Sequence, residues 1–207
     1  MADSLRVARS EFILGGQKSG KSRRAESLAQ TWLATSPDHR AVLIATARAG
    51  DDEMQQRIAR HQRDRAERVP GMITLEEPLK LAEAIQQHST AATLLVVDCL
   101  TLWLTNGLMP VDSAESFTDS TTEKFMENQP VAQVNNEYIA MLLEAISHAA
   151  GPLVLVGNEI GLGVIPMGAQ VRAFVDTLGT LNQQVAARCA RVTLMAAGLP
   201  LILKDSA

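Results

Sequence analysis

A glycine-rich stretch near the amino terminus, Gly15-Gly-Gln-Lys-Ser-Gly20-Lys21-Ser22, has the residue types and spacing that hold a nucleotide polyphosphate. Glycine permits backbone conformations that turn amide N–H groups inward around phosphate oxygens. Lys21 would add a positive charge at the outer phosphates, and the Ser22 hydroxyl could ligate Mg²⁺. The stretch is a complete Walker A motif, and it predicts a bound triphosphate.

A carboxylate that could complete a Mg²⁺ site follows an apolar run in the middle of the chain. The run Leu94–Val97 ends in Asp98, which predicts that Asp98 lies at the carboxyl end of a central strand. Open α/β sheets bind their ligands at that edge. Asp98 could hold Mg²⁺ directly or through water. The alternative, that Asp98 only caps the next turn, stays open.

A histidine lies on the apolar face of a predicted helix. Met54, Ile58 and His61 are spaced by four and then three residues, so they share one helix face. Five arginines crowd the same stretch: Arg57, Arg60, Arg63, Arg65 and Arg68. One interpretation is a hydrogen-bonded histidine with a solvated arginine face. The other is a nucleophilic imidazole that forms a phosphoramidate, with the arginines neutralising phosphate charge.

The elements that must position these residues form an α/β pattern. Short apolar runs recur at Phe12–Leu14, Ala41–Ala45, Thr93–Val97, Leu153–Val156 and Val192–Met195. Helix-like segments separate most of them, which predicts βαβ units and a parallel sheet. We expect one P-loop NTPase-like three-layer domain over residues 1–207, with a mainly parallel sheet and a small C-terminal antiparallel hairpin over residues 192–204.

Helical periodicity supports the predicted layers. Two stripes have the spacing of a helix face packed on a sheet: Ala25, Leu28, Ala29, Trp32 and Leu33, and then Val171, Phe174, Leu178, Leu181 and Val185. Met141–Leu143 is expected in the core. The polar side of the second helix carries Arg172, Asp176, Asn182 and Gln183, which is typical of a solvated or interface surface.

Two other segments are unusual in composition. Residues 109–133 are polar, rich in serine and threonine and bracketed by prolines, which predicts a flexible surface excursion. After the run that ends at Val156, Asn158 and Glu159 precede Gly161 and Gly163. These glycines would permit close approach of a cofactor or a neighbouring subunit; a glycine-rich turn with a capping glutamate is the alternative.

The bulk composition excludes several classes of function. The 207 residues carry a net charge of -4, which gives no reason to expect nucleic acid as a partner. No apolar run approaches the ~20 residues that cross a bilayer, and the first residues lack the apolar core of a secretion signal. Cys99 and Cys189 are expected to be reduced core residues. We therefore expect a cytoplasmic protein.

Several motifs together resemble one family, the bifunctional adenosylcobinamide kinase/adenosylcobinamide-phosphate guanylyltransferases of cobalamin biosynthesis. They are GGQKSGKS at 15–22, IATA at 44–47, DDEMQQRIARHQRDR at 51–65, EEP at 76–78, DCLTLWLTN at 98–106, GNEIGLGVIP at 157–166 and RAFVDTLGTLNQQVA at 172–186. The resemblance implies phosphorylation of adenosylcobinamide with ATP or GTP. It further implies transfer of GMP from GTP to adenosylcobinamide phosphate, giving adenosyl-GDP-cobinamide.

The resemblance also assigns residues. It implies that His61 is the guanylylated histidine, that the protein is a homotrimer, and that a corrinoid is a candidate for the close approach at Gly161 and Gly163. The phosphate-loop pattern and the strand-end carboxylate in turn predict that Lys21 is catalytic and that Ser22 and Asp98 hold Mg²⁺. The nucleotide-binding positions that the resemblance implies are Gly15, Gly16, Gln17, Lys18, Ser19, Gly20, Lys21, Ser22, Ala45, Thr46, Ala47, Gln62, Arg63, Asp64, Arg65, Glu76 and Asp98. Lys18 stands where the family usually has arginine, and Met72 where it favours tryptophan.

Two other functions are compatible with the phosphate loop. A single-function small-molecule kinase would need only the loop and Asp98, with His61 in the core. A non-catalytic nucleotide-dependent switch would bind a nucleotide and a partner without a small-molecule acceptor. The histidine helix favours the bifunctional enzyme, because a switch has no use for it.

Overall fold

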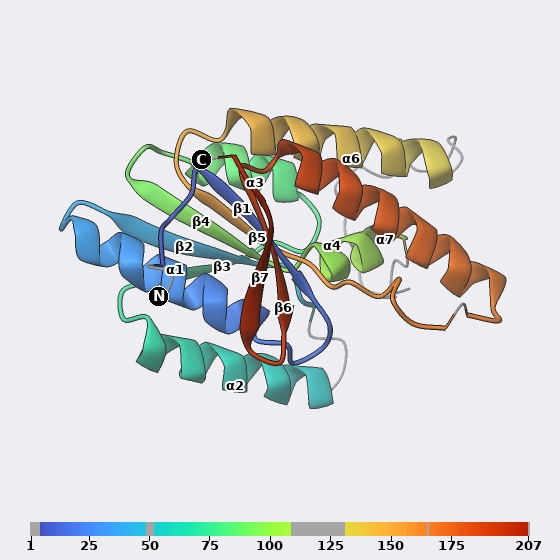
Figure 1. Cartoon of the computed structure of the whole chain (residues 1–207), viewed down its shortest axis with the longest axis horizontal. Helices are drawn as coiled ribbons and strands as arrows, with labels where there is room; N and C mark the ends of the chain where they lie inside the picture. The colour runs from blue at the N-terminus through green and yellow to red at the C-terminus, as the bar shows by residue number, and fades with distance from the viewer. Residues whose placement is uncertain (1–4, 49–51, 109–130, 165, 207) are drawn as a thin grey trace, which may run out of the picture.

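A seven-stranded sheet forms the centre of the protein in the computed structural model, with the strand order β3-β2-β4-β5-β1-β6-β7 (Figure 1). The structure describes residues 5–48, 52–108, 131–164 and 166–206, and only the backbone of residues 52–58, 61 and 131–135. The strands are β1 (Ser10–Gly15), β2 (Arg40–Ala45), β3 (Ile73–Glu76), β4 (Thr93–Asp98), β5 (Leu153–Val156), β6 (Arg191–Ala196) and β7 (Leu199–Asp205). Every pairing is parallel except β6 with β7.

Helices cover both faces of this sheet. They are α1 (Lys21–Thr35), α2 (Asp52–Arg68), α3 (Leu81–His88), α4 (Leu100–Leu108), α6 (Val131–His148) and α7 (Ala169–Arg188). In Figure 1, α1 and α2 lie on one side of the strands, and α3, α6 and α7 lie on the other. The predicted three-layer P-loop fold and its C-terminal hairpin are confirmed.

Two hydrophobic cores lie on opposite faces of the sheet. Along β1, Phe12 and Leu14 pack into the core under α3, α4, α6 and α7, whereas Ile13 packs into the core under α1. Successive strand side chains alternate between faces, so a strand covered on both sides must be apolar throughout. This explains why the buried strands appear in the sequence as continuous apolar runs.

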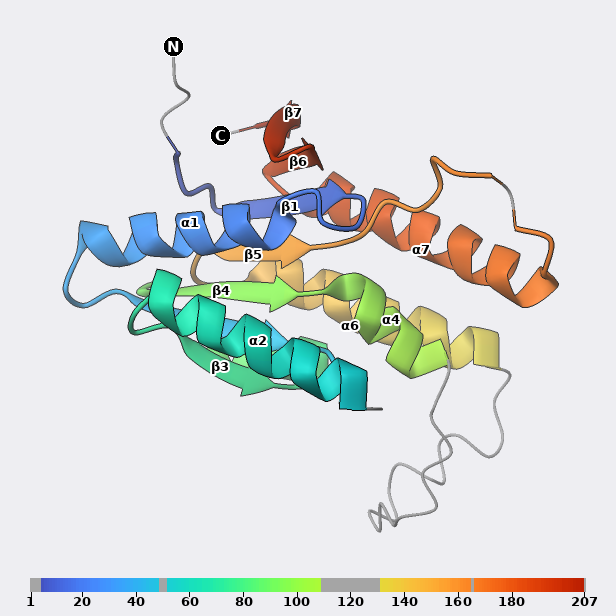
Figure 2. The ribbon, with the colours of Figure 1, turned by 90° about the horizontal axis from the view of Figure 1, so that it is seen from below.

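The carboxyl ends of the central strands meet at one edge. Ala45 of β2 pairs with Asp98 of β4, and Asp98 pairs with Val156 of β5. The phosphate loop follows β1 at this same edge. Figure 2 shows the β5–α7 connection and the first turns of α7 extending past these strand ends.

Some expectations about elements were wrong. Strand β3 was not predicted, because this edge strand is largely exposed and has no buried apolar run. Residues 131–133, assigned to the surface excursion, begin α6; residues 109–130 lie outside the described part of the chain. Met141 and Val171, expected to face the core, are exposed. Asn182, expected on a solvated surface, is buried and donates to the Asn158 carbonyl at 3.2 Å.

Other expectations hold. Leu142 and Leu143 are buried, and both cysteines are buried free thiols. Burial raises the pKa of Cys99 to about 11 and that of Cys189 to about 12. Within the described residues, no helix is long and apolar enough to span a bilayer.

Candidate active site

The phosphate loop needs glycine at its first position. Gly15 has a φ of 152°, and a Cβ there would lie 2.5 Å from the Met195 carbonyl oxygen and 2.6 Å from the Ser19 hydroxyl. Gly20, with a φ of 102°, precedes the first residue of α1. Both positions have backbone conformations that side chains disfavour. The two motif glycines therefore shape the loop and let it approach β6 closely.

Lys21 points back into the loop. Its Nζ donates to the carbonyl oxygens of Gly15 at 3.0 Å and Gly16 at 2.7 Å. The side chain is buried, and this burial lowers the pKa of the ammonium group, while Cys99 and Asp98 act in the opposite direction. The ammonium group thus lies inside the loop, where the motif predicts the outer phosphates.

Ser22 and Asp98 come together at the mouth of the loop. The Ser22 hydroxyl donates to Asp98 Oδ2 at 3.1 Å, across 76 positions of sequence. One oxygen comes from the first turn of α1 and the other from the carboxyl end of β4. A hydroxyl and a carboxylate are ligands that suit Mg²⁺. The residues present therefore fit the predicted metal.

Two buried polar groups near this loop have no hydrogen-bond partner within the described structure. They are the Ser19 hydroxyl in the loop and the Nε of Arg65 in α2. Buried polar groups are usually hydrogen-bonded, so an orphaned donor calls for an explanation. A bound phosphate, which presents only acceptor oxygens, would satisfy both donors. The orphaned donors support a phosphate site on this side of the sheet.

Arg65 is buried, unlike the other arginines of the cluster whose side chains the structure describes. It donates to the Thr74 hydroxyl at 3.4 Å, whereas Arg60, Arg63 and Arg68 are exposed. Burial lowers the pKa of the Arg65 guanidinium, and Asp98 is the nearby charge that most opposes this shift. Of the two interpretations of this stretch, the solvated arginine face does not hold at Arg65.

Gln62 of α2 contacts the end of β3. The Gln62 amide donates to the Glu76 carboxylate at 3.2 Å. Oδ2 of Asp64 lies 3.5 Å from Nη2 of Arg68, which is one turn later on the same helix. His61 lies within α2, and its side chain is outside the described structure, so its predicted role is not tested by the geometry.

Thr46 holds two strand ends together. Its hydroxyl donates to the Cys99 carbonyl at 2.7 Å and accepts from the Cys99 amide at 2.9 Å. Asn106 donates to the Thr46 carbonyl at 2.7 Å. With its polar groups engaged, the Thr46 side chain positions β2 against the turn after β4. Its neighbours Ala45 and Ala47 are partly exposed at the same edge.

Asn106 and Glu26 were not singled out from the sequence. Glu26 lies four residues after Ser22 in α1, and this i, i+4 spacing places both on one helix face. Its carboxylate is buried and accepts from Arg68 at 2.7 Å. Burial raises the pKa of Glu26. The i, i+4 spacing from Ser22 could have indicated Glu26 as a site residue, whereas no pattern in the neighbouring sequence indicates Asn106.

The turn after β5 contains the capping glutamate of one of its two interpretations; close approach of a ligand or a neighbouring subunit stays a prediction. The Glu159 carboxylate accepts from the Gly161 amide at 2.8 Å and so caps the turn. The Glu159 amide donates to the Gly15 carbonyl at 3.2 Å, which joins this turn to the phosphate loop.

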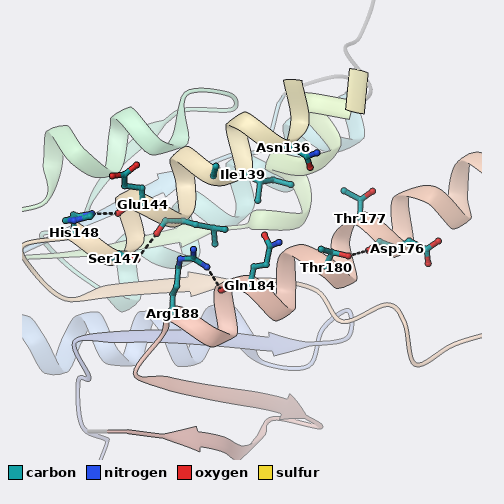
Figure 3. A pocket seen from close by; sticks show the side chains of 12 residues that line it. Asn136, Ile139, Glu144, Ser147, His148, Asp176, Thr177, Thr180, Gln184 and Arg188 are labelled. Atoms are coloured by element: carbon teal, nitrogen blue, oxygen red, sulfur yellow. Dashed lines mark hydrogen bonds between the residues drawn. The ribbon is translucent and has the colours of Figure 1, made fainter. Parts of the chain in front are cut away.

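A cavity lies away from the phosphate loop's own residues. It is a groove of about 760 Å³ between α6 and α7, and none of the predicted site residues lines it (Figure 3). Within the described residues, no cluster of three or more histidine, cysteine or acidic side chains could hold a metal. A cation at Ser22 and Asp98 would therefore need further oxygens from the nucleotide or water.

A Walker A loop at the carboxyl edge of a mainly parallel sheet defines a P-loop nucleotide-binding protein. Residues 11–203 match the profile of the family described as cobinamide kinase / cobinamide phosphate guanyltransferase, and the chain belongs to this family. Family membership confirms the prediction of a bifunctional kinase and guanylyltransferase of cobalamin biosynthesis, an enzyme whose reactions depend on nucleotides.

Similar proteins have related names. The chain is 45% identical over 195 residues to the bifunctional adenosylcobalamin biosynthesis protein CobP of Pseudomonas aeruginosa, covering 94% of this chain and 96% of the relative. It is 31% identical over 193 residues to CobU of Escherichia coli, covering 93% and 98%. The CobU protein of Salmonella typhimurium is 29% identical over 196 residues, with the same coverage.

Proposed function

We propose that this protein phosphorylates the aminopropanol hydroxyl of adenosylcobinamide with ATP or GTP. It then transfers GMP from GTP to that phosphate through His61, giving adenosyl-GDP-cobinamide and pyrophosphate. The observation that carries the proposal is the contact of Ser22 with Asp98 at 3.1 Å, beside Lys21 inside the phosphate loop. This arrangement provides the charge and the oxygen ligands that a triphosphate with a divalent cation requires.

In the kinase step the loop residues hold the triphosphate. Lys21 exchanges its bonds to the Gly15 and Gly16 carbonyls for bonds to phosphate oxygens. Arg65 and Ser19 direct their unpartnered donors to the same anion. The substrate hydroxyl attacks the γ-phosphorus in line and passes its proton to solvent water as the new P–O bond forms. The bond from the γ-phosphorus to the bridging oxygen breaks, and the nucleoside diphosphate leaves.

In the guanylyl step His61 is the nucleophile. A neutral imidazole nitrogen attacks the α-phosphorus of GTP, a P–N bond forms, the bond to the bridging oxygen breaks, and pyrophosphate leaves. A phosphate oxygen of adenosylcobinamide phosphate then attacks the same phosphorus. The P–N bond breaks and its electron pair returns to the imidazole. The exposed Arg60 and Arg63 of α2 supply positive charge for the developing anions.

We propose Ser22 and Asp98 as the protein ligands of Mg²⁺. Bound there, the cation would neutralise charge on the phosphate oxygens. Mg²⁺ takes about six oxygen ligands, so phosphate oxygens and water would complete its shell. The remaining nucleotide contacts are proposed at Gln17, Lys18, Ala45, Ala47, Gln62, Arg63, Asp64 and Glu76. We further propose a homotrimer that acts in the cytoplasm.

The guanylyl-histidine proposal is tested with α-³²P GTP and Mg²⁺, followed by denaturation. We expect the wild-type protein to carry acid-labile, base-stable label, and the His61→Ala variant to carry none while still phosphorylating adenosylcobinamide. His148→Ala, a change of an exposed histidine at the end of α6, is the matched control and should label normally. A single-function kinase predicts no label and full activity in His61→Ala. A wild-type preparation that carries no label but still transfers GMP would rule out the guanylyl-histidine intermediate.

A further inference from the structure

The connection from β5 to α7 exposes large apolar side chains that the proposed mechanism does not use. The side chains of Leu162, Val164 and Met167 are 83%, 96% and 96% exposed. Single exposed apolar residues are ordinary, but a group of them on one segment marks a surface that binds something.

This segment is held at both ends. At its start the Glu159 amide bonds to the phosphate loop, and the Glu159 carboxylate caps the turn at Gly161. At its end Arg172 of α7 donates to the Pro166 carbonyl at 3.0 Å and to the Met167 carbonyl. The exposed side chains therefore stand on a backbone that is anchored to the phosphate loop and to α7.

A cavity of about 310 Å³ lies on this segment, with an apolar lining and a polar side. Its lining includes Ile160, Val164, Pro166, Arg172, Val175 and Asp176. Asp176 also lines the groove between α6 and α7, where Thr177, Thr180 and Gln184 follow it along α7 (Figure 3). The apolar cavity and the polar groove thus share one residue and adjoin each other.

We propose that this surface, residues 160–164, 166 and 167 with the Asp176 end of the groove, binds the corrin ring of the cobinamide substrate; we call it the corrin platform. The proposal rests on the proposed function and names the surface that holds its acceptor. A corrin is a flat macrocycle with methyl groups and primary-amide side chains. Its apolar face suits Ile160, Val164 and Pro166, and its amides suit the carboxylate and hydroxyls of Asp176, Thr177 and Thr180.

The position of the platform favours the acceptor over a second copy of the chain. The acceptor hydroxyl must reach the γ-phosphorus, so its ring must bind beside the phosphate loop. Glu159 contacts Gly15 directly, and the five residue-to-residue steps from Glu159 to Val164 span at most about 18 Å. In the proposal, the aminopropanol arm of a ring on the platform covers this distance to the loop.

The test compares the full-length protein with the double variant Val164→Ser/Met167→Ser. Both side chains are almost fully exposed, so the variant should fold. Leu203→Ser on β7, where the leucine is 56% exposed, is the control for loss of an exposed apolar side chain. Adenosylcobinamide binding is measured by equilibrium dialysis with the visible absorbance of the corrin. Kinase kinetics and the oligomeric state by analytical ultracentrifugation are measured in parallel.

We expect the Kd and KM for adenosylcobinamide to rise at least tenfold in the double variant. The KM for ATP and the kcat should stay within twofold of wild type, and the oligomeric state should be unchanged. In Leu203→Ser, every measured value should stay within twofold of wild type. An unchanged cobinamide Kd overturns the platform, and so does a change of oligomeric state, which would identify an intersubunit contact. If the wild-type protein neither binds nor phosphorylates adenosylcobinamide, the proposed function itself fails.

Discussion

Lys21 is held in the phosphate loop by the same carbonyl groups that shape the loop. Its ammonium group has two acceptors within the loop, at 3.0 Å and 2.7 Å. Both are neutral carbonyls, which do not offset the cost of burying a charge as a phosphate would. This explains why burial lowers the pKa of Lys21, and why a triphosphate should raise it again.

The lowered pKa of Lys21 predicts a pH dependence of nucleotide binding. The nucleotide-free lysine loses its proton at a lower pH than an ordinary lysine, and binding to phosphate favours the protonated form. The Kd for ATP should therefore rise several-fold as the pH is raised from about 8 to about 10. Isothermal titration calorimetry in buffers of different ionisation enthalpy would detect the proton taken up.

Two variants check this assignment. In Lys21→Met, ATP binding should be at least tenfold weaker at pH 8 and should no longer vary with pH over this range. Arg23→Met, a change of an exposed neighbour in α1, should retain the wild-type profile. If the Kd for ATP of Lys21→Met varied with pH as in the wild type, the pH dependence would come from a group other than Lys21.

At the scale of elements, an ion pair and a hydrogen bond at Arg68 join α1 and α2. Arg68, the last residue of α2, pairs with the buried Glu26 of α1 at 2.7 Å. The Gln30 amide of α1 donates to the Arg68 carbonyl. Burial raises the pKa of Glu26, and Arg68 is the nearby cation that most opposes this shift. The helix that carries His61 is thus tied at its C-terminal end to the helix that begins with Lys21.

Loss of this tie should destabilise the protein in a pH-dependent way. In Arg68→Ala the Glu26 carboxylate is left buried without its partner, which should cost about 1 kcal/mol, since Arg68 is itself partly exposed. Glu26, with its pKa raised further, becomes protonated more readily as the pH falls. The loss of unfolding free energy should therefore be larger at pH 8 than near pH 5.

Urea denaturation at both pH values measures this difference. Arg60→Ala removes an exposed arginine of the same helix and should change stability by less than about 0.5 kcal/mol. Hydrogen exchange should also show faster opening of α2 in Arg68→Ala than in Arg60→Ala. Equal losses at the two pH values would show that Glu26 does not respond to Arg68.

At the scale of the whole molecule, one sheet contributes side chains to two hydrophobic cores. One layer of helices covers each core. Trp103 of α4 is buried in one core and donates to the Leu79 carbonyl at 2.9 Å. Trp32 of α1 packs against the other core and stacks on His39, with ring centroids 3.7 Å apart. Because the strands contribute alternate side chains to both cores, neither core can be lost without exposing the sheet.

The prediction of a single domain over residues 1–207 can be tested through these two tryptophans, since the chain has no others. In Trp32→Phe and Trp103→Phe variants, each remaining tryptophan reports one core. Their fluorescence changes on urea unfolding should have the same midpoint as the far-ultraviolet circular dichroism, after allowance for the stability of each variant. Separate midpoints within one variant would show two units that unfold independently.

The sequence by itself determined the features that depend on local spacing. The glycines of the phosphate loop, the apolar runs of β1, β2, β4, β5 and β6, and the terminal hairpin all follow from backbone conformation and side-chain periodicity within a few residues. Lys21, Ser22 and Asp98 were found in the same way, because each lies next to such a signal.

Only the tertiary structure decided which distant residues meet and which are buried. The Ser22–Asp98 contact, the burial of Arg65 and Asn182, and the engaged hydroxyl of Thr46 all depend on elements that lie far apart in the chain. Edge strand β3 has no local pattern and exists through its pairing with β2. Long-range packing sets the burial and the partners of these polar residues, and neither can be read from the spacing of neighbouring residues.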